Sequence, residues 1–234
     1  PNANLSSTDN LWSPRAGVVY KPTEPVSIYA SYSIAYQPRA GEQLASLSPT
    51  NKAFDPEKFT NYEIGAKWDI NPTLAFTAAV YQLERTNVVV PSATDPTISV
   101  LVDGQRAKGV EVGLAGSLAT WWHVMGGYAW QDGEVLAGAD KGKRLAQLPQ
   151  NTFSLWNRFD VAERWGVGFG AQYRDEMFAQ LTNAVTVKSF TRYDAAVFFD
   201  ARDSLSLQLN IENLFDKEYV SAANSDNNIL PGSP

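Results

Sequence analysis

The sequence predicts an all-β protein, a segment of a transmembrane antiparallel up-and-down β-barrel. Three observations predict it. Apolar residues recur at every second position in one segment after another, which is the period of a strand. The connections between these segments alternate between short and long, and no helical segment of convincing length is present. The chain has 234 residues, of which 44% are hydrophobic and 12% aromatic.

The alternation is clearest in four segments, residues 26–36, 61–70, 165–174 and 205–211. In the last of these, the odd positions are Leu or Ile and the even positions are Ser, Gln and Asn. Such a segment predicts a strand with one apolar and one polar face. Six further strands read less clearly, and they are expected at residues 13–20, 73–86, 105–118, 121–131, 151–160 and 190–200. The prediction is therefore ten strands.

Short connections contain turn residues, as in the sequences KPTEP, NPT, LAT, VAER and ARDS. Longer polar connections separate them, at residues 37–58, 87–104, 132–150, 179–189 and from 216 onward. This order predicts antiparallel hairpins with all tight turns at one end and all long loops at the other.

A membrane barrel is favoured over a soluble β-sandwich or adhesin, which would fold in water without detergent. Many strands have about ten residues, the length that a tilted strand needs to cross a bilayer. Aromatic residues near the strand ends suit the two lipid interfaces. They are Tyr20, Tyr36, Trp68, Trp122, Trp130, Trp165, Tyr173 and Tyr193. Ten strands would leave open edges, so we expect a piece of a larger barrel, with at least one further strand after residue 234.

The composition excludes several classes of protein. The chain has no Cys, one His and two Met, so disulfides and metal sites built from these residues are not expected. There is no Gly-x-Ser-x-Gly motif to support a serine hydrolase. The net charge is −6 and no basic cluster is present, which argues against nucleic acid as a partner. No run of 18 apolar residues and no signal peptide occurs.

Several stretches resemble TonB-dependent outer-membrane receptors in the order expected for that family. They are SPRAGVVYKPTEPVSIYASYS, FDPEKFTNYEIGAKWDI, LAFTAAVYQLERTNV, AKGVEVGLAGSL, GKRLAQLPQNTFSLWNRF, NIENLFDKEYV and NNILPGSP. The last resembles the final external loop of the ferric-siderophore branch. The resemblance implies a 22-stranded barrel, of which residues 1–234 would be one part, strands twelve to twenty-one. The plug, its TonB box and the closing strand would lie outside the chain.

The resemblance also implies a function. The whole protein would take up ferric siderophores across the outer membrane of a Gram-negative cell, driven by the TonB-ExbB-ExbD complex through the plug. It would not be an enzyme and would hold no cofactor, because iron arrives as the siderophore chelate. Outer-membrane lipid and lipopolysaccharide would be further partners. Another cargo, such as cobalamin or a sugar, and a passive porin remain alternatives; a porin would lack the NLFDKEY match.

Arginines near the external strand ends are the candidate ligand contacts, since catecholate siderophores are anionic and aromatic and arginine both attracts and stacks on such groups. The candidate ligand-binding residues are Tyr36, Arg39, Arg85, Arg174 and Arg192. The alternative is that each arginine pairs with a carboxylate of the lumen, such as Glu63, Asp194 or Glu212.

Three other features have structural or lipid-related interpretations. The segment from Asn213 to Tyr219 is expected to form a turn with interfacial aromatics rather than to contact ligand. Arg106 and Lys108 share the parity of the lipid-facing residues, and they either bind lipopolysaccharide phosphates or begin a frayed strand. His123 is expected to be a packed residue near a periplasmic turn.

Overall fold

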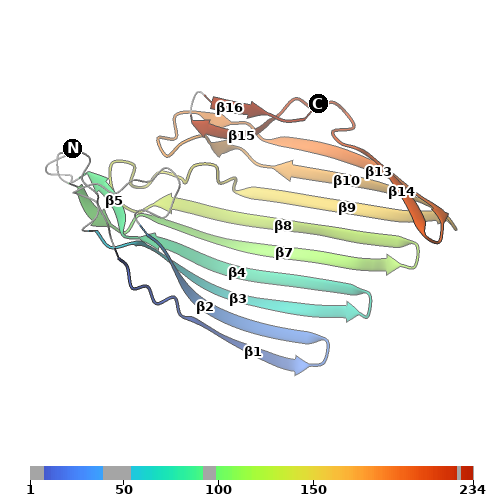
Figure 1. Ribbon diagram of the computed structural model, residues 1–234, viewed down its shortest axis with the longest axis horizontal. Helices are drawn as coiled ribbons and strands as arrows, with labels where there is room; N and C mark the ends of the chain where they lie inside the picture. Colours follow the sequence, from blue (N-terminus) through green and yellow to red (C-terminus); the bar gives the residue numbers. More distant parts are fainter. Residues whose placement is uncertain (1–7, 39–53, 92–98, 226–227, 234) are drawn as a thin grey trace.

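The computed structural model describes residues 8–38, 54–91, 99–225 and 228–233. Its centre is one antiparallel sheet of ten strands, in the order β1-β2-β3-β4-β7-β8-β9-β10-β13-β14 (Figure 1). The strands are β1 (Arg15–Thr23), β2 (Val26–Gln37), β3 (Glu57–Asn71), β4 (Leu74–Thr86), β7 (Gln105–Ala119), β8 (Trp122–Val135), β9 (Asn151–Ala162), β10 (Trp165–Arg174), β13 (Phe190–Arg202) and β14 (Leu205–Ile211). Within these residues, no helix is long and apolar enough to span a bilayer.

All ten predicted strands are confirmed. The largest differences are of four residues each: β3 begins at Glu57 rather than at residue 61, and β8 ends at Val135 rather than at residue 131. Residues 57–60 pair with the end of β2, where Gln37 lies opposite Glu57 and Ile34 opposite Thr60. The partner strand, rather than the local sequence, extends β3.

Three short hairpins lie within the long connections, and the sequence analysis did not predict them. They are β5 (Val88–Pro91) with β6 (Ser99–Val102), β11 (Met177–Phe178) with β12 (Thr186–Val187), and β15 (Val220–Ser225) with β16 (Asn228–Pro231). Strands of two to six residues are too short for an alternating pattern to stand out.

Two-residue turns join the strands in pairs, at residues 24–25, 72–73, 120–121, 163–164 and 203–204. At the second turn, the side-chain oxygen of Asn71 accepts hydrogen bonds of 2.9 Å from the main-chain N and the Oγ1 of Thr73, which stabilises the turn. All five turns lie at one end of the sheet, on the right of Figure 1. The predicted arrangement of tight turns opposite long loops is confirmed.

Side chains alternate between two faces of the sheet. One face, called here the polar face, carries Tyr29, whose hydroxyl donates to Glu63 Oε1 at 2.6 Å, and Tyr81, whose hydroxyl donates to Gln131 at 3.1 Å. The opposite face, called the apolar face, is covered by exposed large apolar side chains. They include Val18, Tyr20, Tyr62, Ile64, Trp68, Val80, Val110, Tyr128, Phe153, Trp165, Val167, Phe169, Val197, Leu207 and Leu209.

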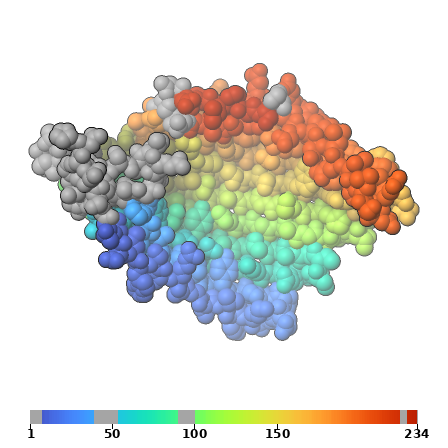
Figure 2. Space-filling model, in the orientation of Figure 1, coloured from blue at the N-terminus to red at the C-terminus, as the bar shows by residue number. Residues whose placement is uncertain are grey.

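The sheet is a single layer, in which strands follow one another as adjoining bands of colour in Figure 2. Among the described residues, no large side chain is fully buried. A β-sandwich would bury its apolar rows against a second sheet about 10 Å away, and the described chain has none. An apolar face of this extent therefore requires lipid rather than water, which contradicts the soluble alternative.

The face assignment predicts opposite outcomes for two adjacent residues. Leu155 lies on the apolar face near the middle of β9, and Ser154 lies on the polar face beside it. Leu155→Arg is expected to destabilise the assembled barrel by about 2–4 kcal/mol, because it places a charge in lipid. Ser154→Arg serves as the matched control and is expected to assemble normally. Heat-modifiable mobility of the full-length protein in gels measures assembly, and equal losses would contradict the assignment.

Candidate functional site

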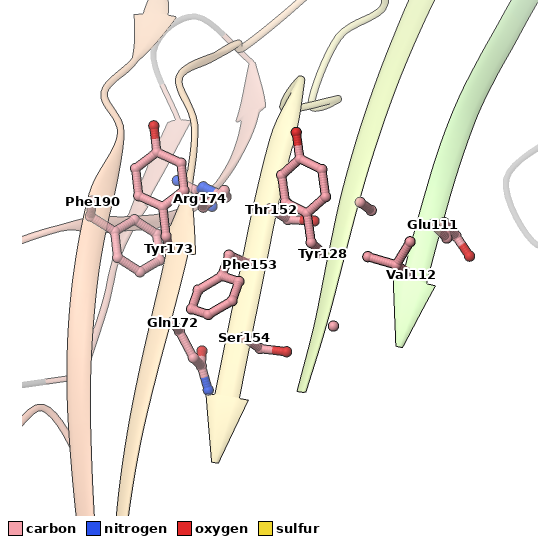
Figure 3. Close-up of a pocket in the computed structure, with 12 residues that line it drawn as sticks. Glu111, Val112, Tyr128, Thr152, Phe153, Ser154, Gln172, Tyr173, Arg174 and Phe190 are labelled. Carbon is pink, nitrogen blue, oxygen red and sulfur yellow. The ribbon is translucent and has the colours of Figure 1, made fainter. Parts of the chain in front are cut away.

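Two hollows adjoin on the polar face, and together they are called the groove. The first has a volume of about 420 Å³ and lies toward the long-loop end; the second has about 530 Å³ and continues toward the middle of the strands. Both include Ser154 and Gln172. Because side chains alternate, residues such as Phe153 contribute only backbone to the groove. Figure 3 shows the first hollow crossing strands β7 to β13. The polar-face residues of the groove include Glu111, Thr152, Ser154, Trp156, Gln172, Arg174, Phe190 and Asp194.

Arg174 ends β10 at the loop end of the groove. Its two terminal nitrogens donate to the main-chain carbonyls of Val220 and Ser221, each at 2.6 Å. Its guanidinium also lies 4.8 Å from the ring centroid of Phe190, which is the residue opposite Arg174 on the neighbouring strand β13. The guanidinium group is planar and directs several N–H donors, so it can bond both carbonyls at once. Arg174 thus fastens the β15–β16 hairpin to the sheet.

Arg192 lies on the polar face of β13 and is only 15% exposed. Its guanidinium donates to Asp194 Oδ2 at 2.9 Å and to the Tyr219 hydroxyl at 3.0 Å, and it lies 3.9 Å from Glu212. Phe190 stacks on Tyr219 with ring centroids 4.3 Å apart. Arg192 therefore has the carboxylate partners of the alternative interpretation, and it holds the same hairpin as Arg174.

Two of the other three predicted residues lie in the described part of the chain, and neither joins this cluster. Arg85 is the penultimate residue of β4 and lies on the polar face, where its Nε donates to Glu57 Oε2 at 2.7 Å. Tyr36 lies opposite Lys58 on the apolar face of β2, on the other side of the sheet from the groove. Arg39 lies outside the described residues. The ligand roles of all five residues remain predictions.

The external connections around the groove are fastened to one another. The side chain of Asn183 accepts from the main-chain N of Arg144 at 2.9 Å and donates to its carbonyl at 3.0 Å. The main-chain N of Gln147 donates to the carbonyl of Phe178 at 2.7 Å. A buried apolar cluster joins the β11–β12 and β15–β16 hairpins through Met177, Ala179, Val187 and Ala223. These connections, residues 136–150, 175–189, 219–225 and 228–231, are called the external cap.

Asp175 joins the cap to the strand ends. Its carboxylate accepts from the Asn151 amide at 2.7 Å, from the Glu176 main-chain N at 2.9 Å and from the Tyr173 hydroxyl at 3.3 Å. The Asn151 amide, helped by the other two donors, lowers the pKa of Asp175 despite partial desolvation. Since this pKa is depressed, the stabilisation is complete above the usual carboxyl pKa and is lost as the pH falls through the lowered value.

The predicted turn at Asn213 is a tightly bonded structure. Asn213 is 5% exposed, has a left-handed backbone (φ 52°), and donates its main-chain N to Asp194 Oδ1 at 2.8 Å. Its side chain bonds the main-chain N and carbonyl of Lys217, at 2.9 and 3.1 Å, and the carbonyl of Ser233 at 3.0 Å. Phe215 is 68% exposed and lies edge-on to Tyr193 of the apolar face. These contacts agree with the structural interpretation of the segment.

Sequence reasoning missed the floor of the groove. The ring of Trp156 lies across Gly168 and Gly170 of the next strand, where an added Cβ would come within 2.4 Å of it. The alternating glycines of the segment WGVGFGAQYR were the available signal, because glycine in a strand often marks a close approach. Glu111, on the polar face of β7, also went unnoticed.

His123 lies at the opposite end of the polar face, near the tight turns. Its Nδ1 is 2.8 Å from Ser117 Oγ and its Nε2 is 3.0 Å from Asp160 Oδ2. Arg158 donates to the other oxygen of Asp160 at 2.9 Å and lies over the Phe198 ring. The position near a turn agrees with the expectation, but the His123 side chain is 39% exposed rather than packed. The four groups form one polar network on the polar face.

A single curved wall with strands of 7 to 15 residues, an exposed apolar face and a polar groove is a segment of a transmembrane β-barrel. The sequence matches the family described as TonB dependent receptor-like, beta-barrel, over residues 1–214. The chain belongs to this family, and it lies in the outer membrane, with the polar face toward the barrel lumen. Its tight turns are periplasmic and its long loops external.

Similar proteins are siderophore receptors by name. The chain is 32% identical over 228 residues to the probable TonB-dependent siderophore receptor PiuA of Acinetobacter baumannii, covering 89% of this chain and 30% of that protein. It is 32% identical over 247 residues to the catecholate siderophore receptor Fiu of Escherichia coli K12, covering 99% and 32%. The crystal structure of PiuA superposes with a TM-score of 0.85 at 31% identity, covering 93% of this chain and 34% of that one.

The chain thus spans about a third of the length of the curated relatives it matches. These relatives are receptors, so membership of the family confirms the prediction that the chain is not part of an enzyme.

Proposed function

We propose that the chain is part of the wall of a receptor that takes up ferric siderophores in a TonB-dependent manner, with the groove on the ligand's path. The observation that carries the proposal is the cluster of Arg174, Phe190, Tyr219 and Arg192 at the external end of the groove. Guanidinium groups and stacked rings suit an anionic, aromatic iron chelate such as a ferric catecholate. The name of the relative Fiu, a catecholate siderophore receptor, supports the same ligand class.

Iron is the cargo in this proposal and stays bound by the siderophore. The described residues contain no group of three His, Cys, Asp or Glu side chains that could hold a metal ion. The chain's own contribution is to position the external cap and to line the lumen with polar groups. The TonB-ExbB-ExbD complex would act through a plug, as the family resemblance implies.

The test is a titration of the purified full-length receptor with ferric catecholate, ferric hydroxamate and cobalamin, reading quenching of tryptophan fluorescence. This chain alone has seven Trp. Saturable quenching by ferric catecholate alone is the expected result. Binding of cobalamin instead would replace the siderophore with another cargo. No binding together with a large, plug-independent ion conductance would favour a porin and overturn the proposal.

A further inference from the structure

A cluster of aromatic and charged side chains lies on the polar face where the groove ends toward the tight turns, and the proposed function does not use it. The cluster is built on β9, β10 and β13, which are neighbours in the sheet. On this face β10 presents only Gly166, Gly168 and Gly170 along this stretch. Side chains of β9 and β13 therefore lean over β10 from both sides.

The ring of Trp156 fills the space that these glycines leave. Its Cζ2 and Cε3 atoms lie 2.4 Å from the positions that a Cβ would take on Gly168 and Gly170, respectively. Phe198 of β13 reaches the same place from the other side, with its Cε2 atom 3.2 Å from the Cβ position of Gly168. The two rings therefore meet above one glycine. Trp156 also lines the second hollow of the groove, which has a volume of about 530 Å³.

Arg158 lies two residues from Trp156 on the same face of β9, a separation of roughly 7 Å at about 3.3 Å per residue. Its guanidinium carbon is 4.4 Å from the centroid of the Phe198 ring, and its Nε donates to Asp160 Oδ1 at 2.9 Å. The other oxygen of Asp160 is 3.0 Å from His123 Nε2. Within the described part of the chain, Nε is the only nitrogen of Arg158 with a hydrogen-bond partner. The guanidinium is thus fixed in place, and the N–H donors of its two terminal nitrogens are open to a ligand.

The carboxylates beside the cluster are themselves bonded within the wall. Asp160 is held by the two contacts just described. Asp194 lines the hollow from β13, and its two oxygens accept from Arg192 at 2.9 Å and from a main-chain N–H at 2.8 Å. Asp200, two residues beyond Phe198, accepts from a serine hydroxyl of β14 at 2.6 Å. The groups left to offer hydrogen bonds at the end of the hollow are therefore the donors of Arg158.

We propose that Trp156, Phe198 and Arg158 bind a small planar aromatic anion, such as a benzoate or a catecholate. The ring of the ligand packs on Trp156 in the hollow, and its carboxylate or phenolate oxygens accept from the terminal nitrogens of Arg158. Aromatic rings attract one another in offset or edge-on arrangements, and a planar guanidinium binds a carboxylate through two parallel hydrogen bonds. Met125, opposite Trp156 on β8 and 64% exposed, adds a sulfur contact to such a ring. A hollow of this volume holds a single-ring ligand.

This site is separate from the arginine cluster at the external end of the groove. Arg158 lies opposite Gly168, which is six residues from Arg174 on β10, so the two levels are roughly 20 Å apart along the strand at about 3.3 Å per residue. A free aromatic acid and a catecholate ring of a siderophore present the same groups to the site. The site therefore does not depend on the proposed cargo.

Equilibrium dialysis of the full-length receptor in detergent tests the site, with benzoate, cyclohexanecarboxylate and a ferric catecholate chelate as probes. The wild type is expected to bind benzoate about fivefold more tightly than cyclohexanecarboxylate, which has the same charge but no aromatic ring. Arg158→Gln is expected to weaken benzoate binding about 10-fold. Arg164→Gln removes the same charge at a periplasmic turn, where Arg164 donates to the carbonyl of Ala201, and is expected to change nothing.

A second variant leaves every charge in place. Gly170→Ala puts a methyl group against the Trp156 ring and displaces it, so the preference for benzoate over cyclohexanecarboxylate is expected to disappear. Gly17→Ala is the matched control, because the nearest atom to its added Cβ is 3.4 Å away. Heat-modifiable mobility in gels verifies that each variant assembles.

Displacement of bound benzoate by the ferric catecholate chelate would assign the site to a ring of the cargo, and benzoate binding without displacement would assign it to a free aromatic acid. Equal binding of benzoate and cyclohexanecarboxylate by the wild type would overturn the site, as would equal losses in Arg158→Gln and Arg164→Gln. No benzoate binding by a receptor that still binds the ferric chelate would overturn this site and leave the proposed function standing.

Discussion

Arg174→Ala is expected to release the β15–β16 hairpin from the lumen wall. The variant loses two charge-assisted hydrogen bonds to the carbonyls of Val220 and Ser221 and the contact with Phe190. Bonds to a charged group contribute about 1.5 kcal/mol each, so local stability falls by about 3 kcal/mol. This corresponds to amide exchange roughly 100-fold faster in residues 219–225. Hydrogen–deuterium exchange of the full-length receptor in nanodiscs measures it.

Two further variants separate positioning from ligand contact. Gln172→Ala removes the neighbouring polar-face side chain of β10 and is expected to leave exchange in the hairpin unchanged. Arg174→Lys keeps the charge but lacks the planar fork, so it is expected to loosen the hairpin nearly as much as alanine does. Siderophore affinity should fall together with hairpin protection across the series. Lost affinity with full protection would instead make Arg174 a direct ligand contact without a positioning role.

Asn213→Ala is expected to lower the free energy of unfolding of the receptor by about 3 kcal/mol. Alanine in a left-handed conformation costs about 1 kcal/mol, and the main-chain partners of the Asn213 side chain lose three hydrogen bonds at about 0.5–1.5 kcal/mol each. Those partners include Lys217 and Ser233, which bracket the last hairpin. Urea titration of the heat-modifiable folded form gives the free energy.

Asn213→Gly divides this loss into its two causes, since glycine tolerates the backbone conformation and removes only the side chain. We expect it to recover about 1 kcal/mol relative to alanine. Asn210→Ala is the control, because Asn210 is exposed and its contact is with Gln208 two residues away. A loss at Asn210 as large as that at Asn213 would show that the turn itself is not the stabilising element.

The strands and their faces were predictable because both follow from a local pattern. In the segment from Leu205 to Ile211, period two alone identifies the strand and its apolar face, and the register with β13 agrees. The tight turns were equally readable from residues such as Asn71 and Pro72. The exact bounds of the strands were harder to predict from the sequence, because the first residues of β3 become part of the strand only by pairing with β2.

The contacts of the candidate site were not predictable in the same way. Arg174 could be placed at the external end of the lumen face, but its partners are the main-chain carbonyls of Val220 and Ser221. A carbonyl has no signature in a sequence, and these two lie on a six-residue strand that follows a polar turn. For Arg192 the partner Asp194 was among the expected carboxylates, because both lie on the same face of one strand.

The strand order has a consequence for how the wall is built. Every strand of the sheet pairs with its neighbours in the chain, apart from the short hairpins within the loops. Five of the nine pairings close across two residues, and four close across the long connections. Because closing a longer chain segment costs more entropy and contact separation slows assembly, we expect five ready hairpins to form first. Closing the four long connections then limits the rate at which these hairpins pair edge to edge.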